Sequence, residues 1–287
     1  MQTTRLNNGI EMPVLGYGVF QITDHEECQK CVRQAIWDGY RLFDTATVYY
    51  NEQDVGKACR EMVKDGAVSR EDLFLTTKVW LQDYGDGKTT QSVERSLKKM
   101  GMEYLDLVLL HQPFGNWQAA WRELEELSRS GLVRAIGVSN FTEKKLEELL
   151  DMAQIIPAVN QIERHPFYTE DRYIARMKGM GVQAESWGAL CEGLKGIFHN
   201  PVLTRIGEKY GKSAAQVAIR WNIQTGCIAL AKSVRSEKMK EDIEVFDFTL
   251  TQDEIRKIAS LDAGHSEIID LENPVTERLL LKAKLLA

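Results

Sequence analysis

The sequence has little proline and no long hydrophobic run. Only 6 of its 287 residues are proline, and apolar runs such as "LVLL" are far too short to span a bilayer. The N-terminal stretch "MQTTRLNNGIEM" is polar and lacks the apolar segment of a secretory signal. We therefore expect a cytoplasmic protein that does not associate with a membrane.

An excess of positive charge is also absent. The formal net charge is −6, and acidic and basic residues are interleaved along the chain. No basic stripe is present to neutralise nucleic-acid phosphates, so we expect no DNA or RNA partner. Apolar residues at 44% and charged residues at 27% are ordinary for a soluble globular protein that buries a sizeable core.

The cysteines are few and odd in number, which argues against a disulfide framework. They are Cys28, Cys31, Cys59, Cys191 and Cys227. In a large chain without a secretory signal they indicate free thiols in a reducing compartment. Cys28 and Cys31 form a C-x-x-C, but "HEECQKCVRQAIWDG" has the pattern of an amphipathic helix, and no second pair completes a metal site. We interpret both as packing residues, with redox or metal chemistry as the less favoured alternative.

A recurring pattern indicates the fold class: a helical segment ends in glycine, and a short apolar strand begins within a few residues. The glycines are Gly39, Gly101, Gly131, Gly181 and Gly226. Each fits the left-handed position just after a helix, which glycine adopts without steric cost. The strands are nearly continuous apolar runs, which is typical of parallel strands buried on both faces by helices.

About eight such strands can be counted, which predicts a closed (β/α)₈ TIM barrel spanning residues 1–287 as a single domain. The strands are expected at residues 15–19, 42–44, 74–78, 107–111, 135–138, 158–161, 183–186 and 227–231. An open doubly wound sheet is the alternative, but "GYGVFQ" fails its G-x-G-x-x-G fingerprint.

The two ends of the chain are expected to lie outside the barrel repeat. An Asn-Gly within residues 1–14 predicts a β-hairpin that closes the bottom of the barrel. The tail, residues 263–287, has no strand period and is predicted to be a loop with a short helix. We expect this tail to border the substrate.

Polar residues close several of the apolar runs. Asp44, Lys78 and His111 end three consecutive strands. The other polar residues at strand ends are Ser139, Asn140, Gln161, Lys232 and Ser233. Taken singly, each could be a helix cap, a turn former or a packed core residue. In a (β/α)₈ barrel, however, the carboxyl ends of the strands meet at one mouth, where active sites lie. Together, these polar residues at strand ends predict an active site at the mouth of the barrel.

The residue types at this mouth suggest a chemistry. Lys78 lies in a buried strand and needs a counter-charge, which Asp44 on the neighbouring strand can supply. Tyr49 follows five residues after Asp44, and a nearby ammonium lowers the pKa of a phenol. His111 could then orient a carbonyl group beside the phenol. A general acid and an orienting group, without a nucleophile or a metal-ligand set, fit the reduction of a carbonyl.

Seven motifs resemble those of the aldo-keto reductases, in order and at that family's spacings, from about residue 5 to residue 262. They are "GYRLFDTATVYYNEQDVG", "FLTTKVW", "YLDLVLLHQPFG", "RAIGVSNF", "AVNQIERHP", "ESWGAL" and "AKSVRSEKMKEDIEVFDF". The resemblance implies a (β/α)₈ barrel that transfers hydride from reduced nicotinamide, usually NADPH, to a small aldehyde or ketone, as an alcohol:NADP⁺ oxidoreductase. Its catalytic tetrad falls on Asp44, Tyr49, Lys78 and His111. The bacterial branch around 2,5-diketo-D-gluconate and small-aldehyde reductases is the most similar.

The same resemblance implies a cofactor site. Ser139, Asn140 and Gln161 would bind the carboxamide, and Trp187 would stack on the nicotinamide ring. The remaining cofactor-binding positions would be Gly188, Leu190, Lys232, Ser233, Val234, Lys238, Glu241 and Asp242. The family commonly has arginine at the position of Lys238, and Glu-Asn at that of Glu241-Asp242. Because lysine cannot form the bidentate contacts of arginine, we expect a weaker preference for NADPH, with NADH as an alternative cofactor and Arg235 as a candidate replacement.

Aromatic residues near the strand ends are candidates for the substrate wall. Phe20, Trp80 and Phe114 could line an apolar slot beside His111, or simply pack. Two other functions remain alternatives: a cofactor-binding regulatory subunit with little turnover, and a Schiff-base lyase that uses Lys78. No long apolar stripe is evident, so we expect a monomer.

Overall fold

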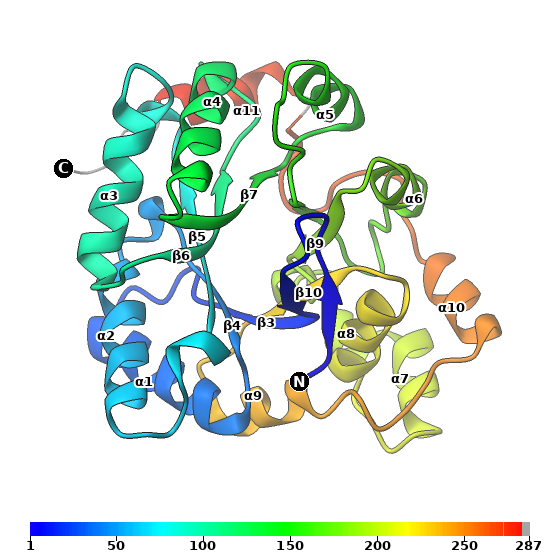
Figure 1. The fold of residues 1–287 in the computed structure, drawn as a ribbon. Helices are drawn as coiled ribbons and strands as arrows, with labels where there is room; N and C mark the ends of the chain where they lie inside the picture. Colours follow the sequence, from blue (N-terminus) through cyan, green and yellow to red (C-terminus); the bar gives the residue numbers. More distant parts are fainter. Residues whose placement is uncertain (272, 283–287) are drawn as a thin grey trace.

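The computed structural model describes residues 1–271 and 273–282, and its centre is a closed parallel barrel (Figure 1). The strand order around the barrel is β10-β3-β4-β5-β6-β7-β8-β9. The strands are β3 (Leu15–Gly18), β4 (Leu42–Asp44), β5 (Phe74–Val79), β6 (Leu105–Leu110), β7 (Val133–Ser139), β8 (Val159–Glu163), β9 (Gln183–Trp187) and β10 (Ile228–Ala231). The predicted barrel and the places of its strands are confirmed.

Several strand boundaries differ from the prediction by one or two residues. Strand β5 continues past Lys78 because Val79 still pairs with Leu110 of β6. Strand β6 ends at Leu110, so His111 follows the strand rather than closing it. Strand β8 extends to Glu163, whose register partner on β9 is Trp187. Pairing with a neighbouring strand, rather than local polarity, decides where these strands end.

Helices surround the barrel, as Figure 1 shows. They are α1 (His25–Asp38), α2 (Glu52–Lys64), α3 (Lys88–Met100), α4 (Trp117–Arg129), α5 (Glu143–Leu150), α6 (Asp171–Gly179), α7 (Pro201–Glu208), α8 (Ala214–Gln224), α9 (Ser236–Ile243), α10 (Gln252–Ala259) and α11 (Pro274–Lys282). Gly39 ends α1 with a φ of 105°, and its N–H bonds the carbonyls of Ala35 and Ile36. The other four predicted glycines also have positive φ.

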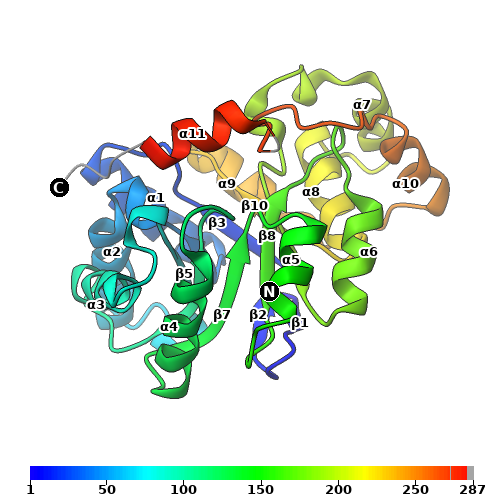
Figure 2. The same ribbon diagram turned by 90° about the horizontal axis from the view of Figure 1, so that it is seen from above.

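The N-terminal hairpin closes the bottom of the barrel, as predicted. It consists of β1 (Thr3–Arg5) and β2 (Glu11–Pro13), which pair antiparallel. Nδ2 of Asn7 donates to the carbonyls of Pro157, at 3.0 Å, and Gly181, at 3.1 Å. Met12 is fully buried in a cluster with side chains from the barrel strands. Figure 2 shows the hairpin at one end of the barrel and α11 at the other.

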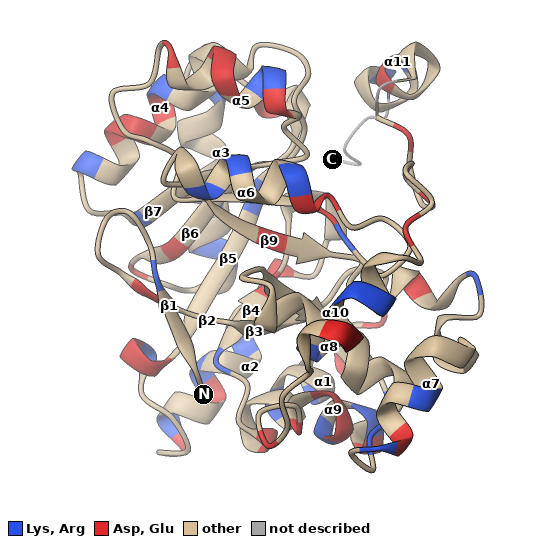
Figure 3. Cartoon of the chain, turned by 90° about the vertical axis from the view of Figure 1, so that its right-hand side faces the viewer, with Lys and Arg blue, Asp and Glu red and all other residues tan. Residues whose placement is uncertain are grey.

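The C-terminal region is a loop followed by the short helix α11, as predicted up to Lys282. The rest of the predicted tail, 283–287, lies outside the described residues, as does residue 272. Lys and Arg are mixed with Asp and Glu over the outer helices (Figure 3). Within residues 1–271 and 273–282, no helix is long and apolar enough to cross a membrane.

The five cysteines are all buried and carry free thiols, as predicted. Cys28 and Cys31 both lie on α1 with their side chains in the main hydrophobic core. Burial raises the pKa of the Cys28 thiol to about 12, which keeps it protonated and unreactive. These observations agree with a packing role.

Candidate active site

A cavity of about 510 Å³ opens at the carboxyl ends of the barrel strands. The predicted site residues that line it are Phe20, Asp44, Tyr49, Trp80, His111, Ser139, Asn140, Gln161, Trp187, Gly188, Leu190 and Lys232. The structure thus brings together residues from β4, β7, β8 and β9 and from the segments that follow β3, β4, β5, β6, β7, β9 and β10. Lys78 is fully buried just behind this surface.

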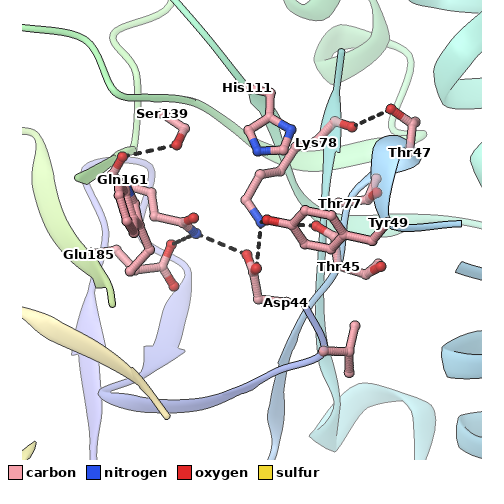
Figure 4. Close-up of polar contacts among 12 residues, drawn as sticks. Asp44, Thr45, Thr47, Tyr49, Thr77, Lys78, His111, Ser139, Gln161 and Glu185 are labelled. Atoms are coloured by element: carbon pink, nitrogen blue, oxygen red, sulfur yellow. Dashed lines mark hydrogen bonds and ion pairs between the residues drawn. The ribbon is translucent and has the colours of Figure 1, made fainter. Parts of the chain in front are cut away.

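Lys78 and Asp44 form a buried ion pair (Figure 4). The ammonium also donates to the backbone carbonyl of Thr45, at 3.0 Å, and lies 3.4 Å from the hydroxyl of Tyr49. Burial alone would lower the pKa of Lys78, but Asp44 and its other polar neighbours raise it. The lysine is therefore a fixed cation, which disagrees with the Schiff-base alternative because that chemistry needs an unprotonated amine.

Tyr49 ends a short 3₁₀ helix, Thr47–Tyr49, that follows β4. Its ring lies over the Lys78 ammonium, with 4.9 Å between the nitrogen and the ring centroid. Burial raises the pKa of Tyr49, and the Lys78 charge opposes this by lowering it. Only the second effect could be predicted from the sequence: Lys78 limits the rise in the pKa of Tyr49, but burial outweighs it.

His111 completes the predicted tetrad. Its imidazole meets the rings of Tyr49 and Trp80 edge-on, at centroid distances of 5.7 Å and 5.0 Å. Burial, together with the charge of Lys78, holds the pKa of His111 well below its usual range, so the ring is neutral. Nδ1 is buried without a hydrogen-bond partner among the described residues. A neutral imidazole in this place can hydrogen-bond a carbonyl oxygen without competing as an acid.

The ends of β7 and β8 are joined by hydrogen bonds. Oγ of Ser139 donates to the carbonyl of Gln161 at 3.0 Å. Asn140 has a left-handed φ of 64°, which turns its side chain back so that Nδ2 donates to the carbonyl of His111, at 3.1 Å. Nε1 of Trp187 in turn donates to Oδ1 of Asn140, at 2.8 Å. The predicted nicotinamide-binding residues therefore form one connected network.

Gln161 contacts Glu185, a buried residue of the site that was not predicted from the sequence. Its Nε2 donates to Oδ2 of Asp44, at 2.9 Å, and to Oε2 of Glu185, at 2.8 Å. Glu185 is fully buried in β9. The signal was present in the sequence, because a lone carboxylate in the buried run "VQAESW" is as costly as the lone ammonium of Lys78.

A second cavity, of about 310 Å³, adjoins the first and shares Leu190, Phe198 and Lys232 with it. The other predicted cofactor residues that line it are Ser233, Lys238, Glu241 and Asp242, together with Arg235. Val234 is 44% exposed and is not among the lining residues described. Lys238 forms an ion pair with Glu241. Burial, reinforced by the neighbouring Glu241, raises the pKa of Asp242 to about 7.

The two cavities fit an extended dinucleotide. Amide, hydroxyl and indole groups line one cavity, and three basic side chains, Lys232, Arg235 and Lys238, line the other. The His111 imidazole lines the first cavity, and its buried Nδ1 has no hydrogen-bond partner among the described residues. This donor set suits a nicotinamide carboxamide at one end and phosphate at the other.

The side of the mouth that is predicted to bind the substrate carries aromatic residues. The Phe20 ring is tilted against that of Tyr49, with 4.9 Å between centroids, and Trp80 stands behind His111. Phe114 is only partly buried and is not among the described lining residues of either cavity. Val48, Glu192 and Phe198 line the cavity but were not singled out from the sequence. They lie on 3₁₀ helices of three residues each, Thr47–Tyr49, Cys191–Gly193 and Ile197–His199, which are too short to give a periodic signal.

Comparison with known proteins agrees with this geometry. The model of the aldo/keto reductase family matches residues 14–196 and 198–263, so the chain belongs to this family of oxidoreductases. It is 43% identical over 261 residues to a glyoxal reductase of Bacillus subtilis, covering 91% of this chain and 92% of the relative. It is 39% identical over 263 residues to the methylglyoxal reductase DkgA of Escherichia coli K12, covering 91% of this chain and 93% of the relative.

Solved structures show the same fold. A Brucella melitensis aldo/keto reductase has a TM-score of 0.85 and 39% identity, covering 91% of this chain and 99% of its own. An aldo-keto reductase of Bombyx mori, solved in complex with NADP, has a TM-score of 0.89 and 31% identity, covering 94% of this chain and 95% of its own. The family assignment made from the seven sequence motifs is confirmed.

Proposed function

We propose that the protein reduces small aldehydes or ketones to alcohols with NADPH, and that Tyr49 donates the proton. The observation that carries this proposal is the position of the Lys78 ammonium, which contacts both Asp44 and the hydroxyl of Tyr49 while His111 stands beside the same phenol. The cofactor is supported by the family, by the NADP complex of the Bombyx mori relative and by the two adjoining cavities.

Ser139, Asn140 and Gln161 would hold the nicotinamide end of the cofactor, with the Trp187 ring against it. Lys232, Ser233, Val234, Lys238, Glu241 and Asp242 would hold the phosphate-bearing end. When bound, the reduced nicotinamide supplies the hydride. The residues of the chain fix one face of the ring toward the substrate, exclude water and provide the proton.

Proton transfer would proceed from Oη of Tyr49 to the carbonyl oxygen of the substrate. Neutral His111 orients that oxygen and stabilises the negative charge that develops on it. As the proton leaves, the phenolate is stabilised by the adjacent Lys78 charge, and Asp44 keeps the lysine charged. The aromatic side chains at the mouth lower the local dielectric, which strengthens each of these interactions.

A small substrate is favoured by the aromatic wall formed by Phe20, Trp80 and Phe198. It is also favoured by the relatives, which are named for reduction of glyoxal and methylglyoxal. NADH remains an alternative cofactor because Lys238 stands where the family commonly has arginine.

The test is the loss of reduced-nicotinamide absorbance with NADPH and then NADH, using methylglyoxal, an aromatic aldehyde and a diketo sugar acid. Turnover that disappears in Tyr49→Phe supports the proposal. Tight NADPH binding without turnover of any carbonyl would instead favour a regulatory, cofactor-binding subunit.

A further inference from the structure

Glu185 is a second carboxyl group inside the barrel mouth, and the proposed mechanism gives it no role. It lies in the middle of β9, opposite Gln161 in the register of β8 and β9, and is fully buried. Its Oε2 accepts the hydrogen bond from Gln161, while its Oε1 is buried without a partner in the described part of the chain. Figure 4 shows Gln161 between Glu185 and Asp44.

The charges around Glu185 do not balance if it is ionised. Lys78 is the cation that acts on it, but the ammonium already contacts Asp44, the carbonyl of Thr45 and the hydroxyl of Tyr49. An ammonium has three hydrogens, so none is left for Glu185. One positive charge cannot neutralise two buried carboxylates, and an unpaired buried carboxylate is costly. Burial, reinforced by the nearby Asp44, raises the pKa of Glu185 to about 8.

Glu185 also lies close to the proposed nicotinamide site. Trp187 follows it two residues later on the same face of β9, about 6.6 Å along the strand. Gln161 joins Glu185 to Asp44 by its two hydrogen bonds. The nicotinamide ring is cationic when oxidised and neutral when reduced. A negative charge one layer deeper in the barrel therefore stabilises the oxidised form more than the reduced form.

We propose, building on the proposed function, that Glu185 is a positioning residue whose charge sets the redox preference of the site. When neutral, it accepts from Gln161 and holds that amide against Asp44. When ionised, it favours the oxidised cofactor. The added negative charge also makes a Tyr49 phenolate less stable, so it opposes proton donation. The site is then suited to reduction at neutral pH and shifts toward alcohol oxidation in alkaline solution.

Other titratable groups face Glu185 or the cavity above it: Tyr49, Lys78, His111, Cys227 and Glu192. The pKa values of Tyr49 and Lys78 are raised, so both keep their protons, and that of His111 is lowered, so it is already neutral. Burial raises the pKa of Cys227 to about 12. Glu192 lines the same cavity, and burial raises its pKa as well. Glu192 is therefore the control for substitutions of Glu185.

The first experiment measures the dissociation constants of NADP⁺ and NADPH by titration between about pH 6.5 and about pH 9.5, on either side of the Glu185 transition. Both forms carry the same phosphates, so titration at the phosphate end cancels in their ratio. The wild-type ratio is expected to move about tenfold toward NADP⁺ as pH rises. Glu185→Gln should have a constant ratio, and Glu192→Gln should show the same change of the ratio with pH as wild type, whatever its absolute affinities. The same shift in Glu185→Gln, or its loss in Glu192→Gln, overturns the proposal.

A second experiment uses the protein without cofactor and so separates this inference from the proposed function. Infrared spectra with isotope-labelled glutamate should show a protonated carboxyl band near pH 7 that disappears in alkaline solution, in wild type and in Glu192→Gln. Absence of that band refutes a neutral Glu185, even if Glu185→Gln fails to fold. If the band is present but neither cofactor binds, the reductase proposal is wrong, and with it the assigned role of Glu185.

Discussion

The indole nitrogen of Trp187 donates a hydrogen bond to Oδ1 of Asn140, at 2.8 Å. This contact ties the end of β9 to the segment after β7, and Asn140 is held in turn by the carbonyl of His111. The aromatic ring at the proposed nicotinamide site is therefore fixed in orientation before a cofactor binds. A fixed ring lowers the entropy lost on binding.

Trp187→Phe tests this contact. Phenylalanine keeps a ring for stacking but cannot donate to Asn140, so the affinity for NADPH is expected to fall about three- to tenfold, the effect of one neutral hydrogen bond. Fluorescence or calorimetric titration measures it. Trp80→Phe, which removes an indole on the substrate side, should leave the dissociation constant of NADPH unchanged. An equal loss in both variants would mean that the Trp187 hydrogen bond is not the cause.

Tyr49→Phe separates proton donation from binding. The ring still packs against Phe20 and His111, but the hydroxyl near Lys78 is gone. We expect turnover to fall by at least about 10²- to 10⁴-fold, while NADPH affinity changes less than about twofold. Steady-state kinetics and a binding titration give the two quantities. Tyr50→Phe, one residue later, is the control and should keep its turnover. Parallel loss of cofactor binding would contradict a pure proton-donor role.

The sequence predicted the barrel and the tetrad because both leave strong local signals. Apolar runs after glycine-terminated helices mark the strands, and a charge such as Lys78 in a buried run needs a partner, which Asp44 on the adjacent strand β4 supplies. Glu185 gives the same signal, but it lies two residues before the aromatic that ends its strand, so a search of strand ends does not identify it. Phe114, which follows β6 and is not among the described lining residues of either cavity, stays a prediction, because periodicity does not describe turns.

Contacts between elements that are far apart in the sequence could not be predicted from the sequence alone. The Trp187 hydrogen bond depends on the left-handed backbone of Asn140, which positions the amide in space. The net pKa shift of Tyr49 depends on burial by surrounding elements as well as on the Lys78 charge. In both cases the contacting residues come from separate segments of the chain, so their combined effect could be assessed only in the folded structure.

Lys78→Met removes the cation from the mouth. Without that charge the pKa of Tyr49 rises further, so carbonyl reduction should be almost abolished and its pH profile altered. Because Asp44 is left as an unpaired buried charge, the free energy of unfolding should drop by about 3–5 kcal/mol. Denaturant unfolding and pH-dependent kinetics measure these effects. The double variant Lys78→Met/Asp44→Asn should recover much of the stability without recovering activity. Full activity with an unchanged pH profile would refute the role of Lys78.

Lys238→Met tests the discrimination between the two cofactors. Lys238 lies in the basic second cavity, where its ammonium pairs with Glu241 and, in our proposal, contacts the phosphate that distinguishes NADPH from NADH. Loss of a charged hydrogen bond of this kind should weaken NADPH binding about tenfold or more and leave NADH binding unchanged.

The exposed Lys240 on the same helix provides the matched control. Lys240→Met changes the net charge equally, so it corrects for long-range attraction between the protein and the phosphate. Lys238→Arg should raise the preference for NADPH, since a guanidinium can bind phosphate through two parallel hydrogen bonds. The ratio of kcat/KM for NADPH and NADH measures all three variants. If Lys238→Met and Lys240→Met lower that ratio equally, Lys238 acts only through net charge, and another residue of the cavity, such as Arg235, must bind the phosphate.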